Sequence, residues 1–380
     1  MTGMLHLQRI WFLAAITLPV LLSCGTASGT DLDYRFSGEA SGWALGALAE
    51  SEDTWNVGAR YLPAFSVDTE SAGGNMLDLY VYLNMFAAAS SIDDYDDYKL
   101  DLYRLVFRYT TDRTETRIGL QKIAFGPAMV LRSLMWFDSI DPRDPQQLTE
   151  GVYALRLRYD ALDNSSLWLW GIYPDGERKG LEIVPSEEGY PELGGRYLRP
   201  VPRGEMAVTF NSRQAEIPGT GLDSRENRFA LDGKWDIGIG LWFEAVMQHQ
   251  DEDFIPMQWR KMFTLGTDYT FGIGNGLYVI LEHMGIFMSD DTWGSDQDYQ
   301  TTAWMANYPI GFIDNLSAIG YYSWAAEKYY QYIAWQRTWD NWMLHVSAFH
   351  YPETDVSFSP YGEGPPLMGT GGQVLVVFNH

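Results

Sequence analysis

The chain has a single cysteine and no long apolar run after its first residues. Cys24 stands alone among 380 residues, so an intrachain disulfide is excluded. Beyond the N-terminus, the densest apolar stretches, such as Leu167–Trp170, are a few residues long, whereas a membrane-spanning helix needs about 20 apolar residues. The lack of a long apolar run excludes a helical membrane protein. It does not exclude a β-barrel, because barrel strands alternate lipid-facing and lumen-facing residues.

Histidine is also scarce, and familiar catalytic motifs are missing. Apart from the N-terminal His6, the histidines are His249, His283, His345, His350 and His380. None stands in a metal-binding spacing such as H-E-x-x-H, and no G-x-S-x-G nucleophile motif occurs. We therefore expect no enzyme. A barrel enzyme that gathers catalytic groups from separate strands stays as a minor alternative.

The charge is strongly one-sided, with a formal net charge of -24. Such an acidic chain is not expected to bind nucleic acid. The acidic residues gather in Asp93–Asp97, in Asp251–Asp253, and at Asp290, Asp291, Asp296 and Asp298. A solvated loop surface is the main interpretation of these clusters. Loop-bound calcium is a second one, and no other cofactor is expected.

The N-terminus reads as an export signal. Arg9 precedes the apolar run Ile10–Leu22, which is followed by the small residues of Ser23–Ala27. A basic start, a short apolar core and a small-residue exit predict a cleaved signal peptide over residues 1–27. Leu21-Leu22-Ser23 before Cys24 loosely resembles a bacterial lipobox, so Cys24 is either lipidated or lies before an ordinary cleavage site. Residues 28–380 are then one exported domain.

The exported part consists of period-2 segments bounded by turn residues, which predict β-strands. Short connections at 110–114, 161–164, 272–276 and 340–341 alternate with long ones, except for the connection near 62–74. Outer-membrane barrels alternate short periplasmic turns with long outer loops in this way. We count 18 strands, and 16 stays open because Lys179–Arg203 is weakly patterned. Aromatic residues form 15% of the chain, which suits interfacial girdles.

Arginines gather on the inner side of three consecutive predicted strands. Leu100–Tyr109 and Val152–Asp160 alternate apolar residues with arginine, and the strand from Arg117 also carries Gln121 on the arginine side. The chain has 20 Arg and only 6 Lys, and the guanidinium fork suits carboxylates and phosphates. The arginines concerned are Arg104, Arg108, Arg117, Arg156 and Arg158. They predict one charged wall of a pore.

The third outer loop, Gly126–Glu150, is unusually long and apolar. Residues such as Leu134 and Trp136 should not lie open to water, so the loop is expected to fold into the lumen. Long structureless loops are usually functional. Rings of charged side chains select solutes in pores. We therefore predict a constriction in which the five arginines face Asp138, Asp141 and Asp144 of the loop, with Gln121 and Arg132 also among its residues.

Two segments carry a family resemblance. Arg117–Gly126 and Glu150–Arg158, on either side of the Trp136-bearing loop, are similar to porin-type barrels of the alginate-export group. The resemblance implies an 18-stranded barrel with an arginine-rich lumen for polyanions, in a family that tends to be monomeric. Leu120 departs from the pattern, because that group tends to have arginine there. The acidic loops also differ from an obvious polyanion funnel.

The sequence thus predicts an all-β, antiparallel transmembrane barrel in the outer membrane of a Gram-negative bacterium. The predicted function is a porin-like diffusion channel for small polar or charged solutes. Expected partners are outer-membrane lipid, lipopolysaccharide and the solutes, and the chain is expected to be a monomer or a homotrimer. Two alternatives remain: a plugged structural or binding barrel, and a soluble secreted carbohydrate-binding β-protein.

Overall fold

The computed structural model describes residues 32–49, 53–71, 73–91, 97–217, 222–251, 257–352 and 368–380. The predicted signal peptide over 1–27, Cys24, and most of the acidic segments at 93–97 and 251–253 lie outside this range. Among the described residues, no helix is long and apolar enough to cross a membrane.

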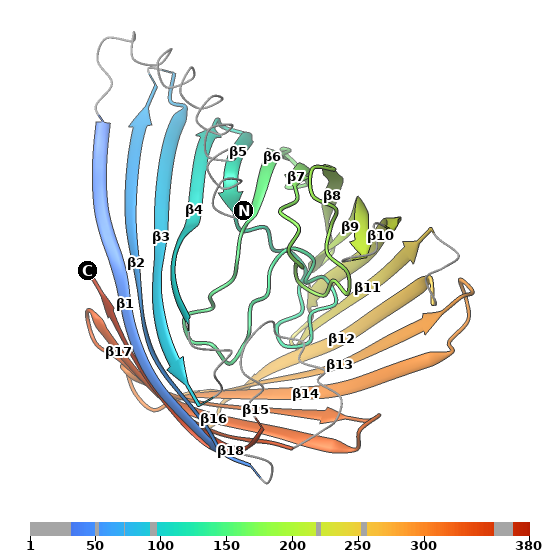
Figure 1. Cartoon of the computed structure of the whole chain (residues 1–380). Helices are drawn as coiled ribbons and strands as arrows, with labels where there is room; N and C mark the ends of the chain where they lie inside the picture. Colours follow the sequence, from blue (N-terminus) through green and yellow to red (C-terminus); the bar gives the residue numbers. More distant parts are fainter. Residues whose placement is uncertain are drawn as a thin grey trace.

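The described residues form a closed antiparallel barrel, an 18-stranded sheet in which β1 pairs with both β2 and β18. Closure leaves no unpaired strand edge, as a lipid environment requires. Figure 1 shows the strands curving around a lumen that contains irregular segments. The strands are β1 Leu32–Leu48, β2 Thr54–Glu70, β3 Met76–Ser90, β4 Asp97–Thr110, β5 Thr114–Gln121, β6 Val152–Asp160, β7 Ser166–Tyr173, β8 Glu192–Val201, β9 Gly204–Ile217, β10 Leu222–Asp236, β11 Gly240–Gln250, β12 Trp259–Phe271, β13 Leu277–Ser289, β14 Gln297–Pro309, β15 Asp314–Ser323, β16 Lys328–Thr338, β17 Trp342–Tyr351 and β18 Gly369–Asn379.

The predicted strand count of 18 is confirmed. The long connection expected near residues 62–74 is wrong, because most of this segment belongs to β2. The apolar pattern ends β2 at Leu62, but β2 continues to Glu70 and pairs with β1 as far as Leu32↔Thr69. Ser66 and Asp68 alternate there with apolar residues, and the backbone ladder continues regardless of side-chain polarity. Only residues 71–75 then connect β2 to β3, so short turns lie at one end of the barrel throughout.

The outer face of the barrel is apolar. On β6, Leu155, Leu157 and Tyr159 are exposed, whereas the alternating Arg156 is buried. The same alternation continues around the sheet, with Phe229, Phe263, Leu265 and Leu281 exposed. This inverted pattern, with apolar residues outside and polar residues inside, is the signature of a transmembrane barrel. The chain is therefore an outer-membrane barrel of the Gram-negative type.

The core lies between the barrel wall and two segments inside it. Residues 122–151 connect β5 to β6, and residues 174–191 connect β7 to β8. Both run within the ring of strands in Figure 1, in teal and green. The fully buried side chains include Ile123, Leu134 and Trp136 from the first segment and Trp242 and Ile280 from the wall. The lumen is thus partly filled, and the two segments decide what space is left.

Candidate functional site

Residues 122–151, here called the lumen loop, make a circuit of the inner wall. This arrangement confirms that the third outer loop folds inward. In chain order the loop meets β11 and β13, then β12, then β16, then β1 and finally β4. The contacts that mark this path are Ala128 N to Glu244 at 3.0 Å, Leu131 N to Glu282 at 2.5 Å, Ser133 to Thr264 at 2.6 Å, the Arg143 carbonyl to Tyr332 at 3.1 Å, Gln146 to Glu39 at 2.6 Å and the Thr149 carbonyl to Arg104 at 2.5 Å.

Two wall glutamates hold the first half of the lumen loop. The Glu244 carboxylate accepts hydrogen bonds from the backbone N–H groups of Ala128 and Leu134, at 3.0 and 2.8 Å. The Glu282 carboxylate accepts from Met129 at 2.7 Å and from the next two residues of the loop. Both glutamates are fully buried. A hydrogen bond to a charged group contributes about 1.5–3 kcal/mol, so these five bonds fix the backbone strongly.

Glu244 and Glu282 are not among the site residues predicted from the sequence. Glu244 lies between Phe243 and Ala245, and Glu282 lies between Leu281 and His283, at inward positions of β11 and β13. An acid on the inner side of an apolar strand, with no Lys or Arg next to it in the sequence, was the available signal. Its partners are backbone N–H groups 110 and more residues away, and no side-chain pattern reveals them.

An aromatic cluster packs the middle of the lumen loop against β7. The Phe125 ring stacks on Trp170 at 5.7 Å and meets Trp136 edge-on at 5.6 Å, and Phe137 packs against both Phe125 and Trp170. The Arg196 guanidinium lies over the Phe125 ring at 5.3 Å. Each aromatic pair adds about 0.5–1.5 kcal/mol beyond burial. The cluster therefore closes the lumen on the β6–β8 side.

We expect Trp136→Ala to loosen the lumen loop without opening the barrel. Trp136 is 1% exposed, and a buried Trp→Ala change costs roughly 3–5 kcal/mol. Limited proteolysis should then cut within residues 126–150, while the heat-modifiable gel shift of the folded barrel is retained. Trp324→Ala, at an exposed Trp beyond β15, is the control. A loop in the variant that resists protease as well as the wild type contradicts this packing role.

The second half of the lumen loop is less buried than the first half. Arg143 pairs with Asp141 at 2.7 Å within the loop, and its guanidinium lies over the Tyr351 ring at 5.3 Å. Asp144 accepts backbone N–H bonds from Gln146 and Leu148, both at 2.9 Å. Burial raises the pKa of the Asp144 carboxyl, although these two N–H bonds favour its ionised form.

Residues 174–191 cover another part of the wall through a buried ion network. Lys179 pairs with Glu192 at 2.9 Å, and Glu182 pairs with Arg228 at 2.9 Å and Arg213 at 3.4 Å. Glu226 bonds to both of these arginines. Breaking one partner of a buried pair costs about 3–5 kcal/mol. The network therefore fixes this segment against β8–β10, where the sequence pattern was weakest.

The five predicted wall arginines lie on the lumen side but have local partners. Arg108, Arg117 and Arg156 stand in register on β4, β5 and β6. The pairs are Arg108 to Asp78 at 2.8 Å, Arg117 to Glu115 at 2.9 Å, Arg156 to Glu115 at 2.5 Å and Arg158 to Asp160 at 3.0 Å. Arg104 instead donates to backbone carbonyls of Tyr103 and Thr149.

The predicted pairing across the pore is therefore corrected. Asp138 forms an ion pair with Arg132, six residues away, and Asp141 pairs with Arg143. Gln121 is buried and donates to the Ala154 carbonyl at 2.8 Å. Ion pairs form between residues close in sequence because closing a short loop costs less conformational entropy than closing a long one. Asp138 and Asp141 are thus neutralised within the lumen loop, whereas Asp144 accepts hydrogen bonds from backbone N–H groups.

Spare donor capacity remains in the arginine row, which we define as Arg108, Arg117 and Arg156. Within the described chain, the Nε atoms of Arg117 and Arg156 are buried without a hydrogen-bond partner. Arg108 and Arg117 keep 32% and 24% of their side chains exposed. Arg156 also lies over the Trp168 ring at 4.9 Å. A carboxylate or phosphate in the lumen would meet the partly exposed guanidinium groups of Arg108 and Arg117, whereas the two Nε atoms are buried beneath them.

Elsewhere the wall carries both buried apolar residues, such as Ile319 and Ala334, and less buried polar ones. Polar inward residues on the strands opposite the aromatic cluster remain half-exposed: Asn307, Ser317, Gln336, Arg60, Tyr80, Tyr82 and Asn84. In the described ranges, no three His, Cys, Asp or Glu side chains are grouped so as to hold a metal ion. Loop-bound calcium stays a prediction.

Comparison with known proteins supports the fold. The chain matches no protein-family model and no curated protein. Solved structures do match: OccAB2 of Acinetobacter baumannii has a TM-score of 0.61 at 10% identity, over 92% of this chain and 98% of that one. The anion-selective porin of Comamonas acidovorans has a TM-score of 0.53 at 11% identity, over 93% and 100% of the two chains. The outer membrane channel DcaP of Acinetobacter baumannii has 0.50 at 12%, over 93% and 99%.

The fold is that of outer-membrane porins and channels. At these identities the likeness reaches no further than the fold, and the alginate-export group is not among the three structures named above. Function therefore rests on the geometry of the lumen.

Proposed function

We propose that the protein is an outer-membrane diffusion channel for small polar or charged solutes, with the lumen loop as its constriction. The observation that carries this proposal is the circuit of residues 122–151 around the inner wall. A loop that follows the wall, anchored at β11, β13, β16, β1 and β4, narrows a lumen without crossing it. The half-exposed polar residues on β2, β3 and β14–β16 line the remaining path.

Within this channel, the arginine row favours solutes that carry carboxylate or phosphate groups. Arg117 and Arg156 share one acid, Glu115, so the row has more positive than negative charge. Charged side chains in a pore set its ion preference. The resemblance to alginate-export barrels implies the same class of solute. One structural relative is named as anion-selective, which is in keeping with this proposal.

Liposome swelling tests the proposal. Refolded protein is placed in vesicles, and swelling rates are compared for monocarboxylates, neutral sugars and amines of similar size. We expect all small solutes to enter, with the carboxylates several times faster than the amines. Vesicles without protein give the background. Equal swelling rates for the three classes of solute would contradict the preference for anions. Swelling rates equal to those of vesicles without protein would contradict the channel itself.

A plugged barrel is the second candidate, and one observation favours it. The aromatic cluster and the ion network around Glu182 fill the lumen against β6–β10, where Arg213 and Arg228 are almost fully buried. If the lumen loop closes the remaining path as well, the barrel is a structural or binding protein. A folded barrel that passes no solute establishes this candidate.

A further inference from the structure

Four consecutive short turns expose apolar tips at one end of the barrel. These turns connect β10 to β11, β12 to β13, β14 to β15 and β16 to β17. Phe312 is fully exposed, and Ile237 and Ile273 are 50% and 58% exposed. We call the set the apolar rim, which consists of Ile237, Ile239, Ile273, Ile310, Phe312, Ile313 and Trp339.

The short turns on the other side of the barrel differ. The turn at 71–75 carries Ser71 and Asn75, the turn at 111–113 carries Asp112 and Arg113, and the turn at 202–203 is Pro-Arg. Among the described residues of these turns, Leu162 is the one large apolar side chain that is exposed, and Asp163 follows it directly. Turn residues in water are usually Gly, Pro, Asn, Asp and Ser. The apolar rim therefore differs from the polar short turns on the other side of the same barrel.

The apolar rim continues an aromatic surface on the outer face. Arg337 lies between the rings of Trp335 and Trp339, at 5.5 and 5.8 Å, and pairs with Asp314 at 2.8 Å. Trp335 donates its indole N–H to the same Asp314 carboxylate at 3.0 Å. Aromatic rings with an arginine among them are the arrangement that barrels place at the level of lipid headgroups.

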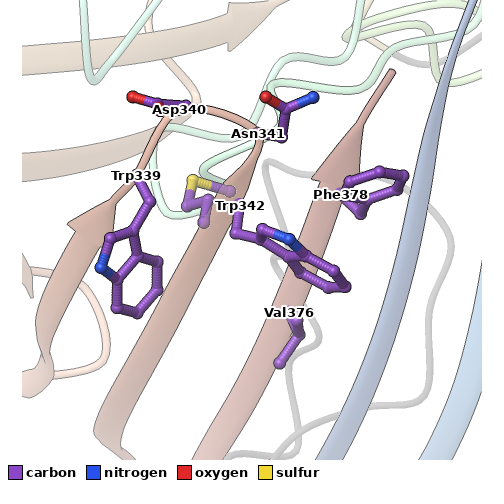
Figure 2. A pocket seen from close by; sticks show the side chains of 7 residues that line it. Trp339, Asp340, Asn341, Trp342, Val376 and Phe378 are labelled. Atoms are coloured by element: carbon purple, nitrogen blue, oxygen red, sulfur yellow. The ribbon is translucent and has the colours of Figure 1, made fainter.

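A shallow hollow of about 670 Å³ lies beside this surface, between the β16–β17 turn and β18. Figure 2 shows Trp342, Val376 and Phe378 along it, with Asp340 and Asn341 in the turn. The rings of Trp342 and Phe378 pack at 4.6 Å. An apolar floor with polar groups at one edge suits an acyl chain and the ester region above it.

The height of the apolar band agrees with this placement. A lipid-facing band is about 25 Å tall, and a tilted strand rises about 2.5 Å per residue along the barrel axis. The band therefore needs about ten residues of each strand. On β12 it starts at Phe263, because the preceding outward residue, Lys261, binds loop carbonyls at the other end. About ten residues later comes Ile273, so the band includes the turn itself.

We propose that the apolar rim inserts into the headgroup–glycerol layer of the membrane leaflet on the short-turn side. Its occupant is phospholipid rather than a protein, because the rim is continuous with the lipid-facing belt and with the Arg337 aromatic group. The barrel then sits deeper in that leaflet on the β10–β17 side than on the β2–β9 side. This inference needs only a barrel in a membrane and is independent of transport.

Depth-dependent fluorescence tests the proposal. Single cysteines are introduced as Phe312→Cys and Ile237→Cys, with Asn75→Cys and Asp112→Cys as matched turn controls, all with Cys24→Ser. Each variant is labelled with an environment-sensitive dye and refolded into vesicles that contain phospholipid brominated near the headgroup. We expect the rim labels to lose about half their intensity to the brominated lipid and to be protected from aqueous iodide. The control labels should behave in the opposite way.

The proposal is overturned if iodide quenches the rim labels as strongly as the label at position 112 and brominated lipid does not quench them. The tips would then stand in water, open to a protein. Heat-modifiable migration of each variant confirms that the barrel has folded. Phe312, Ile237 and Asp112 are exposed and Asn75 is half-buried, and all four lie in turns outside the barrel core, so we expect the substitutions to leave the packing of the barrel unchanged.

Discussion

Glu244→Gln combined with Glu282→Gln is expected to widen the channel and to make its current noisier. The two carboxylates bind five backbone N–H groups of residues 128–134. An amide offers one acceptor oxygen and turns its own N–H donors toward those groups, so several charge-assisted bonds are lost, each contributing about 1.5–3 kcal/mol. The first half of the lumen loop then leaves the wall. We expect single-channel conductance to change by about twofold, with frequent substates.

The matched control for this pair is Glu205→Gln. Glu205 lies at the short-turn end of β9, opposite Lys234, and is exposed. It receives the same chemical change without any loop contact in the described structure. Conductance of the control should equal that of the wild type. If the double variant conducts like the control, with the same noise, the two glutamates do not hold the constriction.

Arg108→Gln, Arg117→Gln and Arg156→Gln together should turn the channel toward cations. The change removes three positive charges and leaves Asp78 and Glu115 unpaired in the lumen. Under a tenfold salt gradient we expect the reversal potential to change sign, because the remaining wall charge is negative. Arg117→Gln alone should move it in the same direction by a smaller amount, and this side chain is exposed enough for the variant to fold.

Arg337→Gln is the control for selectivity. Arg337 pairs with Asp314 much as Arg108 pairs with Asp78, but it lies on the outer face. It changes the total charge by the same amount per residue without altering the lumen. An unchanged reversal potential in the triple variant, or an equal shift in Arg337→Gln, contradicts a selective role of the arginine row.

The barrel fold could be predicted from the sequence because the alternation of apolar and polar residues along each strand is a local pattern. Segments such as Val152–Asp160 show inside and outside residues by alternation alone, and the structure confirms both ends of this strand. The alternation of short and long connections supported the count of 18 strands, and no knowledge of tertiary contacts was needed for it. The apolar content around Trp136 placed the third loop inside, since such residues are costly in water.

The anchoring of the loops could not be predicted, because it depends on contacts distant in sequence. Glu282 binds residues more than 150 positions earlier in the chain, and its partners are backbone groups that every residue carries. Residues around Glu182 looked irregular because a buried ion network, rather than an apolar face, fixes them. Apolar patterning also ended β2 at Leu62, since it does not detect a ladder that continues through polar residues.

Single-channel recording of the refolded wild-type protein in a planar bilayer tests the central claim most directly. The proposed channel predicts stable, discrete conductance steps, with the anchored lumen loop as a fixed constriction beside the half-exposed residues of β2, β3 and β14–β16. Absence of any step, from protein that migrates as a folded heat-modifiable barrel, would contradict the channel and leave a plugged barrel.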